Sequence, residues 1–298
     1  IMAYLGLPAF LWSPQELECL GGVNFLKGGI LHAAKVITVS PTYAKEILTP
    51  AFGYGLDDVV RRRASDLRGI LNGVDRDEWN PEDDEHIAAA FSAKKPAGKA
   101  ECKTALLREL GLATDRDVPL VGVVSRLWEQ KGLDLAVSVL PKFLRKDSLQ
   151  FVLLGSGDAW LENEFKRLAV DFPQLCAVRI GYDNGLSHRI EAGCDFFLMP
   201  SRFEPCGLNQ MYSMAYGTLP IVRATGGLAD TVSGWDGKKK GTGIIFEHAD
   251  QGGIEWALNR ALELYQQPAT YRSLQKTAMA AEFSWAKSAE AHLECYLS

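Results

Sequence analysis

The chain is organised around one loop, Pro200-Ser-Arg-Phe-Glu-Pro-Cys-Gly-Leu208, which follows the apolar run Asp195-Phe-Phe-Leu-Met199. The apolar run predicts a buried strand, and the two prolines of the loop interrupt regular structure on both sides of Glu204. Gly207 allows the backbone to come close to a ligand, and the helix that follows offers unpaired N–H groups to an anion. We therefore expect a carboxylate and a helix N-terminus at the end of a strand, where open α/β sheets bind ligands.

A regular alternation of apolar runs and helical spacing surrounds this loop over residues 100–282. The apolar runs predict strands at 119–125, 149–154, 176–180, 195–199, 219–222 and 243–246. The remaining segments predict helices at 102–110, 133–140, 160–170, 187–192, 208–216, 228–233, 253–265 and 271–280. Continuous apolar strands are typical of a parallel sheet with helices on both faces, so this region is predicted to be a complete Rossmann-like α/β domain.

The first part of the chain, residues 1–72, predicts much less sheet. Two strands are expected, at 35–39 and 67–71, with helices at 25–34, 42–48 and 57–63. A doubly wound domain has about 100–150 residues, so we expect this part to be the back of a domain whose front is absent. Residues 73–99 are predicted to be a polar crossover and surface segment, and residues 283–298 a last amphipathic helix.

Composition argues against several classes of function. The net charge of −5, with Arg61-Arg62-Arg63 as the one cationic cluster, argues against a nucleic-acid partner. Six scattered cysteines without CxxC spacing argue against a disulfide scaffold or a zinc site, so we expect no metal and a reducing compartment. No apolar run reaches the ~18–20 residues of a membrane span, and no membrane association is expected.

Two cations follow the first strand of the Rossmann-like region, in Ser125-Arg-Leu-Trp-Glu-Gln-Lys-Gly132. On that loop, Arg126 and Lys131 are placed to hold a diphosphate and to neutralise charge on a leaving phosphate. Their spacing alone fits two cations that face solvent equally well.

The next two strands also end in residues of interest. Gly155 and Gly157 form a glycine-rich turn with Asp158, which is expected to cap the following helix. Tyr182 follows the third strand, where an aromatic ring either covers a flat base or belongs to the core. His188, on the next helix, is expected to be packed or at the surface rather than to bind a ligand.

Around the central loop, three further features bear on chemistry. Glu204 is expected to orient sugar hydroxyls or to balance positive charge in a transition state. Cys206 has no evident histidine partner and is interpreted as a packing residue rather than a nucleophile. Thr225-Gly226-Gly227 repeats the pattern of strand, glycine and helix, so a second helix N-terminus is expected beside the same anion pocket.

Together, several long motifs resemble the retaining glycosyltransferases that are the bacterial glycogen synthases and plant starch synthases. They are Val39-Ser-Pro-Thr-Tyr-Ala44, Gly69-Ile-Leu-Asn-Gly-Val-Asp75, Val123-Val-Ser-Arg-Leu127, Glu129-Gln-Lys-Gly132, Leu154-Gly-Ser-Gly-Asp158, His188-Arg-Ile-Glu-Ala-Gly193, Pro200 to Leu208 and Thr225-Gly-Gly-Leu-Ala-Asp230. The resemblance covers essentially the whole chain. It implies the GT-B architecture, in which two Rossmann-like domains face each other across a cleft and a final helix returns to the first domain.

The resemblance also implies a reaction, the transfer of glucose from ADP-glucose to the non-reducing end of an α-1,4-glucan, with retention and without a metal or a cofactor. It implies that Glu204 lies beside the transferred glucose, that Arg126 and Lys131 hold the diphosphate, and that Tyr182 covers the adenine. The remaining donor-binding positions implied are Gly155, Gly157, Cys206, Gly207, Leu208, Thr225, Gly226 and Gly227.

Departures from the family limit what is expected of this chain. The Lys-x-Gly-Gly loop and the catalytic-side histidine and aspartate of the family's first domain are absent, so we expect the chain alone to be inactive. Tyr212 stands where other retaining GT-B families have a second glutamate, which places the chain with the glycogen and starch synthases. The implied compartment is the bacterial cytoplasm or the plastid stroma, and the oligomeric state stays open. Two alternatives remain, a GT-B transferase with another nucleotide-sugar donor and a non-catalytic module that binds ADP or glucan.

Overall fold

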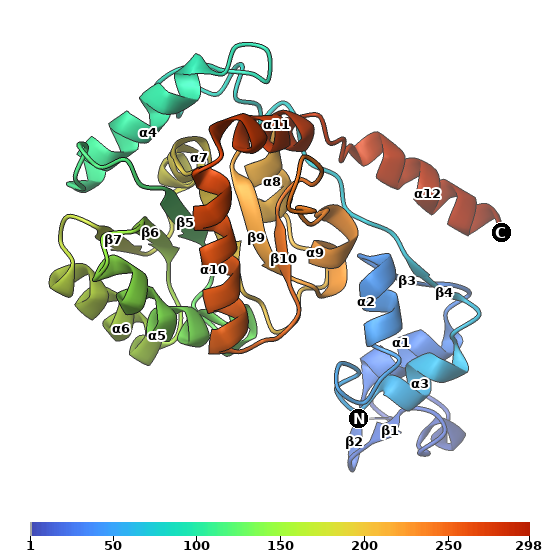
Figure 1. The fold of residues 1–298 in the computed structure, drawn as a ribbon. Coiled ribbons are helices and arrows are strands. Elements are labelled where there is room, and N and C mark those ends of the chain that lie inside the picture. The colour runs from blue at the N-terminus through green and yellow to red at the C-terminus, as the bar shows by residue number, and fades with distance from the viewer. Residues whose placement is uncertain (1) are drawn as a thin grey trace.

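The six strands expected between residues 100 and 282 form one parallel sheet (Figure 1). The structure, a computed structural model, describes residues 2–298. Along the sheet the strand order is β10-β9-β8-β5-β6-β7. The strands are β5 Leu120–Val124, β6 Gln150–Gly155, β7 Cys176–Ile180, β8 Phe196–Met199, β9 Leu219–Arg223 and β10 Ile244–Phe246.

The strand order reverses between β5 and β8. From β5 the chain builds outward through β6 and β7, and it then returns to the other side of β5, where Phe196 of β8 pairs with Val121. β9 and β10 continue outward from β8. The carboxyl ends of β5 and β8 therefore flank the switch point of the sheet, the position at which ligands bind in open α/β folds.

Helices cover both faces of this sheet, which explains why its strands are apolar without alternation. In one layer α5 contacts α6 and α10, and in the other α7 contacts α4 and α8. The helices of this domain are α4 Ala97–Leu110, α5 Leu133–Leu144, α6 Ala159–Asp171, α7 Asn184–Gly193, α8 Asn209–Ala215, α9 Gly226–Thr231, α10 Gln251–Tyr265 and α11 Pro268–Met279. The predicted Rossmann-like domain is confirmed.

Beside this domain lies a smaller part that holds the expected helices and parallel strands. They are α1 Phe25–His32, β3 Val36–Thr38, α2 Pro41–Glu46, α3 Asp57–Arg62 and β4 Leu67–Gly69. An antiparallel pair, β1 Glu18–Cys19 and β2 Gly22–Val23, was not predicted. Its two turn residues, Leu20 and Gly21, both have positive φ, of 52° and 77°. Leucine rarely adopts this conformation, so the sequence carried no hairpin signal.

Part of the segment from 73 to 99, which is predicted to be a polar crossover and surface segment, is packed against the Rossmann-like domain. The Trp79 ring is stacked between His188 and Tyr212, with 3.9 Å between its centroid and each of theirs. Asp84, whose side chain is 1% exposed, accepts a hydrogen bond from His188 Nδ1 at 2.8 Å. Stacking and a buried hydrogen bond thus fix this segment to the Rossmann-like domain, and His188 is packed as predicted.

The last helix, α12 (Trp285–Leu297), extends away from the sheet (Figure 1). It begins beside the start of the crossover segment, where Val74 N donates to Phe283 O at 2.7 Å. Its large apolar side chains, Trp285, Leu293, Tyr296 and Leu297, are exposed. The helix is present as predicted, and its return to a first domain stays a prediction. Among residues 2–298, no helix combines the length and the apolar character needed to cross a membrane.

Candidate active site

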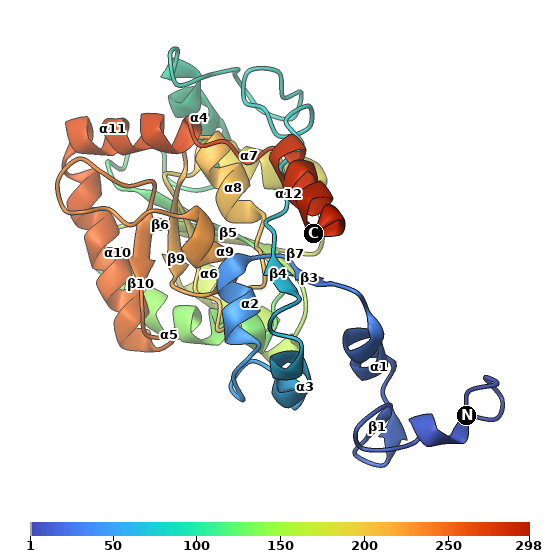
Figure 2. The same cartoon turned by 90° about the vertical axis from the view of Figure 1, so that its right-hand side faces the viewer.

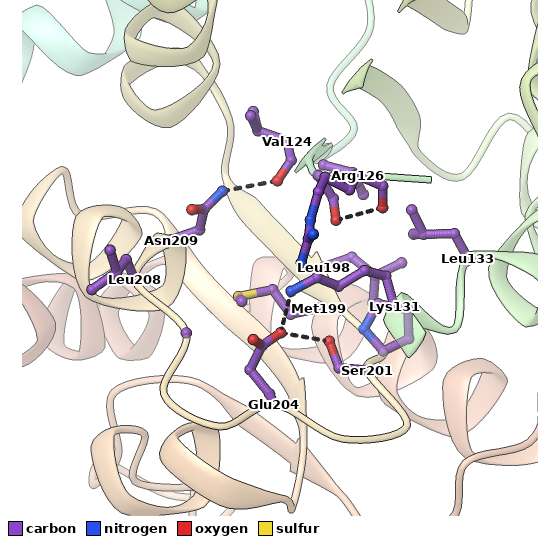
Figure 3. Close-up of a pocket in the computed structure, with 14 residues that line it drawn as sticks. Val124, Arg126, Lys131, Leu133, Leu198, Met199, Ser201, Glu204, Leu208 and Asn209 are labelled. Carbon is purple, nitrogen blue, oxygen red and sulfur yellow. Dashed lines mark hydrogen bonds and ion pairs between the residues drawn. The ribbon is translucent and has the colours of Figure 1, made fainter. Parts of the chain in front are cut away.

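A cavity of about 310 Å³ opens at the carboxyl ends of β5 and β8 (Figure 3). Its volume lies in the range of small-molecule sites. The loop after β5 and the loop after β8 form its walls, as the switch point of the sheet predicts. Its polar lining consists of Ser125, Arg126, Lys131, Ser201, Glu204 and Asn209.

Within the cavity, Lys131 and Glu204 form an ion pair (Figure 3). Lys131 Nζ donates to Glu204 Oε2 at 2.6 Å, and Ser201 Oγ donates to the same oxygen at 3.0 Å. The two side chains of the ion pair are 18% and 7% exposed. Hydrogen bonds to a charged acceptor offset the desolvation that such burial costs. Lys131 and Ser201 therefore fix the orientation of the Glu204 side chain.

A glycine makes this ion pair possible. Gly132 has a φ of 65°, and a Cβ at this position would lie 2.1 Å from the carbonyl oxygen of Pro200. Only glycine adopts this conformation without strain and allows such a close approach. The turn that carries Lys131 therefore packs directly against the start of the Glu204 loop.

Arg126 is the second cation of the cavity. It is exposed, and it forms no side-chain hydrogen bond or ion pair with any of residues 2–298. A guanidinium and an ammonium at the mouth of one cavity can bind two oxygens of a diphosphate. Cations so placed stabilise the charge that develops on a leaving phosphate. In the part of the chain that the structure describes, no three His, Cys, Asp or Glu side chains are grouped to hold a metal ion.

The Glu204 loop is held on its outer side by a second ion pair. Arg202 donates from both terminal nitrogens to the two Asp134 oxygens, at 2.6 and 2.7 Å. This guanidinium holds the pKa of Asp134 below its ordinary value. Arg202 N also donates to Gln130 O at 2.8 Å, so the loops after β5 and β8 are tied together beside the cavity.

Sequence reasoning missed three polar residues of the cavity, Ser125, Ser201 and Asn209. Asn209 Nδ2 donates to Val124 O at 2.8 Å and so ties the start of α8 to the end of β5. Ser201 contacts Glu204 as described above. Asn209 directly follows the predicted loop, and its partner Val124 lies far away in the sequence. Ser201 belongs to the loop, but its contact with Glu204 depends on a loop conformation that residue types do not reveal.

Gly155 at the end of β6, Gly157 after it and Tyr182 after β7 do not line this cavity. A Cβ at Gly155 would lie 1.9 Å from Ser125 O, and a Cβ at Gly157 would lie 2.5 Å from Leu127 O. These glycines therefore allow the loops after β5 and β6 to pack together, and Asp158 caps α6 as expected. Tyr182 is 89% exposed, so it is not a core residue. A role of these residues in donor binding stays a prediction.

Of the residues at the other end of the central loop, Gly207 and Leu208 line the cavity. Cys206 is buried, and this burial raises the pKa of its thiol. A protonated, enclosed thiol is a poor nucleophile, which agrees with the interpretation of Cys206 as a packing residue.

At the start of α9, the predicted anion-binding groups already have protein partners. Gly226 N donates to Glu46 Oε1 at 3.0 Å, and Gly227 N donates to Glu204 O at 3.0 Å. Thr225 is fully buried. Thr225, Gly226 and Gly227 therefore lie behind the Glu204 loop, and none of them lines the cavity. Their role in donor binding stays a prediction.

Comparison with known proteins gives a consistent result over the whole chain. Residues 1–62 match the family of starch synthase catalytic domains, and residues 111–278 match the glycosyl transferases group 1. The chain is 51% identical over 298 residues to a glycogen synthase of Anaeromyxobacter sp. (strain Fw109-5), covering 100% of this chain and 62% of that protein. It is 48% identical over 295 residues to a glycogen synthase of Cellvibrio japonicus (strain Ueda107), covering 98% of this chain and 61% of the relative.

A solved structure agrees with these relatives. The catalytic domain of starch synthase IV from Arabidopsis thaliana, bound to ADP and acarbose, superposes with a TM-score of 0.91 at 38% identity. The match covers 99% of this chain and 63% of that one, so the GT-B fold is confirmed. The chain spans about 62% of the length of the curated relatives that it matches. The chain belongs to the group 1 glycosyl transferases and is, over its whole length, a homologue of the glycogen synthases.

Proposed function

We propose that this chain carries the donor site of an enzyme that transfers glucose from ADP-glucose to the non-reducing end of an α-1,4-glucan, with retention. The observation that carries the proposal is the cavity at the switch point, where Arg126, Lys131 and Glu204 come together. The roughly 50% identity to bacterial glycogen synthases supports the reaction, and the ADP and acarbose bound by the starch synthase IV domain support the donor and acceptor classes.

In this proposal the two cations act on the donor diphosphate. Arg126 is free to bind phosphate oxygens because it has no ion-pair partner within residues 2–298. Lys131 is fixed by Glu204, so its charge is already in place when the bond to the leaving phosphate breaks. Such preorganisation stabilises the transition state more than the bound substrate, which raises kcat.

Glu204 acts on the sugar. Its Oε2 is occupied by Lys131 and Ser201, whereas Oε1 has no hydrogen-bond partner among residues 2–298. A carboxylate oxygen that lines the cavity can accept a hydrogen bond from a glucose hydroxyl and can balance the positive charge of an oxocarbenium-like transition state. Tyr182, exposed at the end of β7, offers a face for the adenine. The bacterial cytoplasm is the proposed compartment, because the relatives at about 50% identity are bacterial.

The test is a direct comparison of donors. Transfer to a maltooligosaccharide is measured with ADP-glucose and with UDP-glucose, for the full-length enzyme that contains this chain, here called the parent protein, and for its Arg126→Ala and Glu204→Ala variants. We expect transfer from ADP-glucose, and a loss of about 10²-fold or more in kcat/KM in either variant. A preference for UDP-glucose would refute ADP-glucose as the donor. Calorimetric binding of ADP without transfer by the parent protein would favour a binding module instead.

A further inference from the structure

Two short helices from different parts of the chain cap each other. Glu46, at the end of α2, accepts hydrogen bonds on Oε1 from Thr225 Oγ1 at 2.8 Å and from Gly226 N at 3.0 Å, at the start of α9. Asp230, near the end of α9, accepts from Thr42 N at 2.9 Å and from Thr42 Oγ1 at 2.6 Å, at the start of α2. The two helices therefore run antiparallel side by side, as Figures 1 and 2 show.

Each carboxylate satisfies N–H groups that a helix cannot satisfy itself, and the partial positive charge at a helix N-terminus attracts it further. The second oxygen of Glu46 is buried without a hydrogen-bond partner among residues 2–298. The hydrogen bonds that the Glu46 carboxylate accepts from residues 2–298 both come from the start of α9. Glu46 therefore links the amino-terminal part to the Rossmann-like domain.

The start of α9 is in turn joined to the backbone of the Glu204 loop. Gly227 N donates to Glu204 O at 3.0 Å. A Cβ at Gly226 would lie 1.9 Å from Glu204 O, and a Cβ at Gly227 would lie 2.0 Å from Cys206 O. Two backbones in such close contact cannot shift independently, so a displacement of α9 displaces the Glu204 backbone.

A second contact reaches the same loop from the amino-terminal part. The rings of Tyr54 and Phe203 meet edge to face, with 5.5 Å between their centroids. Phe203 directly precedes Glu204. The amino-terminal part therefore touches the loop at Phe203 and supports it from behind through Glu46 and α9.

We infer that Glu46 is a positioning residue, which passes the placement of the amino-terminal part through α9 to the backbone that carries Glu204. The inference rests on the proposed function, in which Glu204 acts on the donor sugar. Arg126 forms no side-chain hydrogen bond or ion pair with α9 or with Glu204 among residues 2–298, whereas Lys131 is bonded to the Glu204 side chain. Loss of the Glu46 contact is therefore expected to affect the turnover step more than donor binding.

Hydrogen–deuterium exchange of the full chain tests the coupling without reference to activity. Glu46→Ala removes the cap, Glu46→Gln keeps the Oε1 acceptor, and Lys45→Ala changes an exposed neighbour on the same helix. We expect Glu46→Ala to speed exchange about tenfold in residues 201–208 as well as in 226–231, with the other two variants close to the parent. Faster exchange confined to 226–231 would overturn the inference. If Glu46→Ala fails to fold, Thr225→Val removes one hydrogen bond of the same contact and gives the same comparison.

Kinetics then separates positioning from a merely structural role. We expect Glu46→Ala to lower kcat with ADP-glucose about tenfold with an unchanged KM, and Glu46→Gln to restore it. Equal kcat in Glu46→Ala and the parent would overturn the positioning role. Absence of transfer in the parent protein itself would refute the proposed function and leave the exchange experiment to decide the coupling.

Discussion

Lys131 Nζ lies 2.6 Å from Glu204 Oε2, although 73 positions separate the two residues in the sequence. They meet because β5 and β8 are neighbours in the sheet and end at the same edge. Both side chains are largely buried, so each is the partner that offsets the other's loss of contact with water. A pair of this kind is costly to break on one side only, because the remaining charge stays buried without its partner.

Lys131→Met is therefore expected to destabilise the protein by about 3 kcal/mol and to lower transfer from ADP-glucose by about 10²-fold or more. Urea unfolding and the transfer assay measure the two effects. Lys142→Met is the matched control, because Lys142 forms an exposed ion pair with Glu255 and should cost less than about 1 kcal/mol. Equal losses in the two variants would contradict the assignment of Lys131.

Gly132→Ala tests the close approach that brings Lys131 to Glu204. Its Cβ would lie 2.1 Å from Pro200 O, at a φ of 65°. We expect a loss of about 3 kcal/mol or more, from backbone strain and overpacking together, and weaker binding of ADP.

Gly111→Ala separates these two causes. Gly111 has a similar φ of 71°, but a Cβ there would meet no heavy atom within 4 Å. Strain alone should cost about 1–2 kcal/mol, without an effect on ADP binding. Thermal unfolding and calorimetry of the two variants measure the difference, and equal destabilisation would show that the Pro200 contact is unimportant.

Trp79→Ala tests whether the crossover segment is fixed to the Rossmann-like domain. The change removes a buried ring stacked between His188 and Tyr212, so we expect a loss of about 3–5 kcal/mol. Protease cleavage within residues 73–99 should become faster in the same variant. Trp256→Ala, at a half-exposed position on α10, serves as the control and should change stability far less. Resistance of Trp79→Ala to cleavage would mean that the stacking does not hold the segment.

Glu191 gives the protein a predicted pH dependence. Burial raises the pKa of Glu191 to about 8, against the hydrogen bond from Ser213 and the charge of Lys99, which lower it. The unfolded chain releases this proton near its ordinary pKa of 4.5, whereas the folded protein keeps it up to about pH 8. Between these values the unfolded state binds fewer protons, so stability falls as pH rises.

Glu191→Gln removes this ionisation. The melting temperature of the variant should rise relative to the parent by roughly 5 °C or more between pH 5 and pH 8. Lys99, whose pKa burial lowers to about 8, stays protonated in both states well below that pH and adds slope only as the pH approaches 8, in variant and parent alike. Parallel melting curves of variant and parent would contradict the raised pKa of Glu191.

The fold of the Rossmann-like domain could be predicted because its signal is local. Each strand is a short apolar run, each helix has a periodic apolar face, and the connections are short. The predicted strands and helices appear in the structure with small shifts of their ends. The β1–β2 hairpin was missed because Leu20 occupies a turn position that glycine, asparagine or aspartate usually marks.

The sequence alone was enough to predict the fold class and the likeness to the glycogen and starch synthases. It also indicated that the loops after β5 and β8 carry the charged residues of the site. It did not reveal that Lys131 is paired with Glu204, that Trp79 is stacked on His188, or that Glu46 caps α9. Each of these contacts joins residues far apart in the chain, and each depends on strand order or on the approach of two loops. Residue types and spacing specify local conformation, whereas the partner of a buried charge is determined only when the whole sheet has formed.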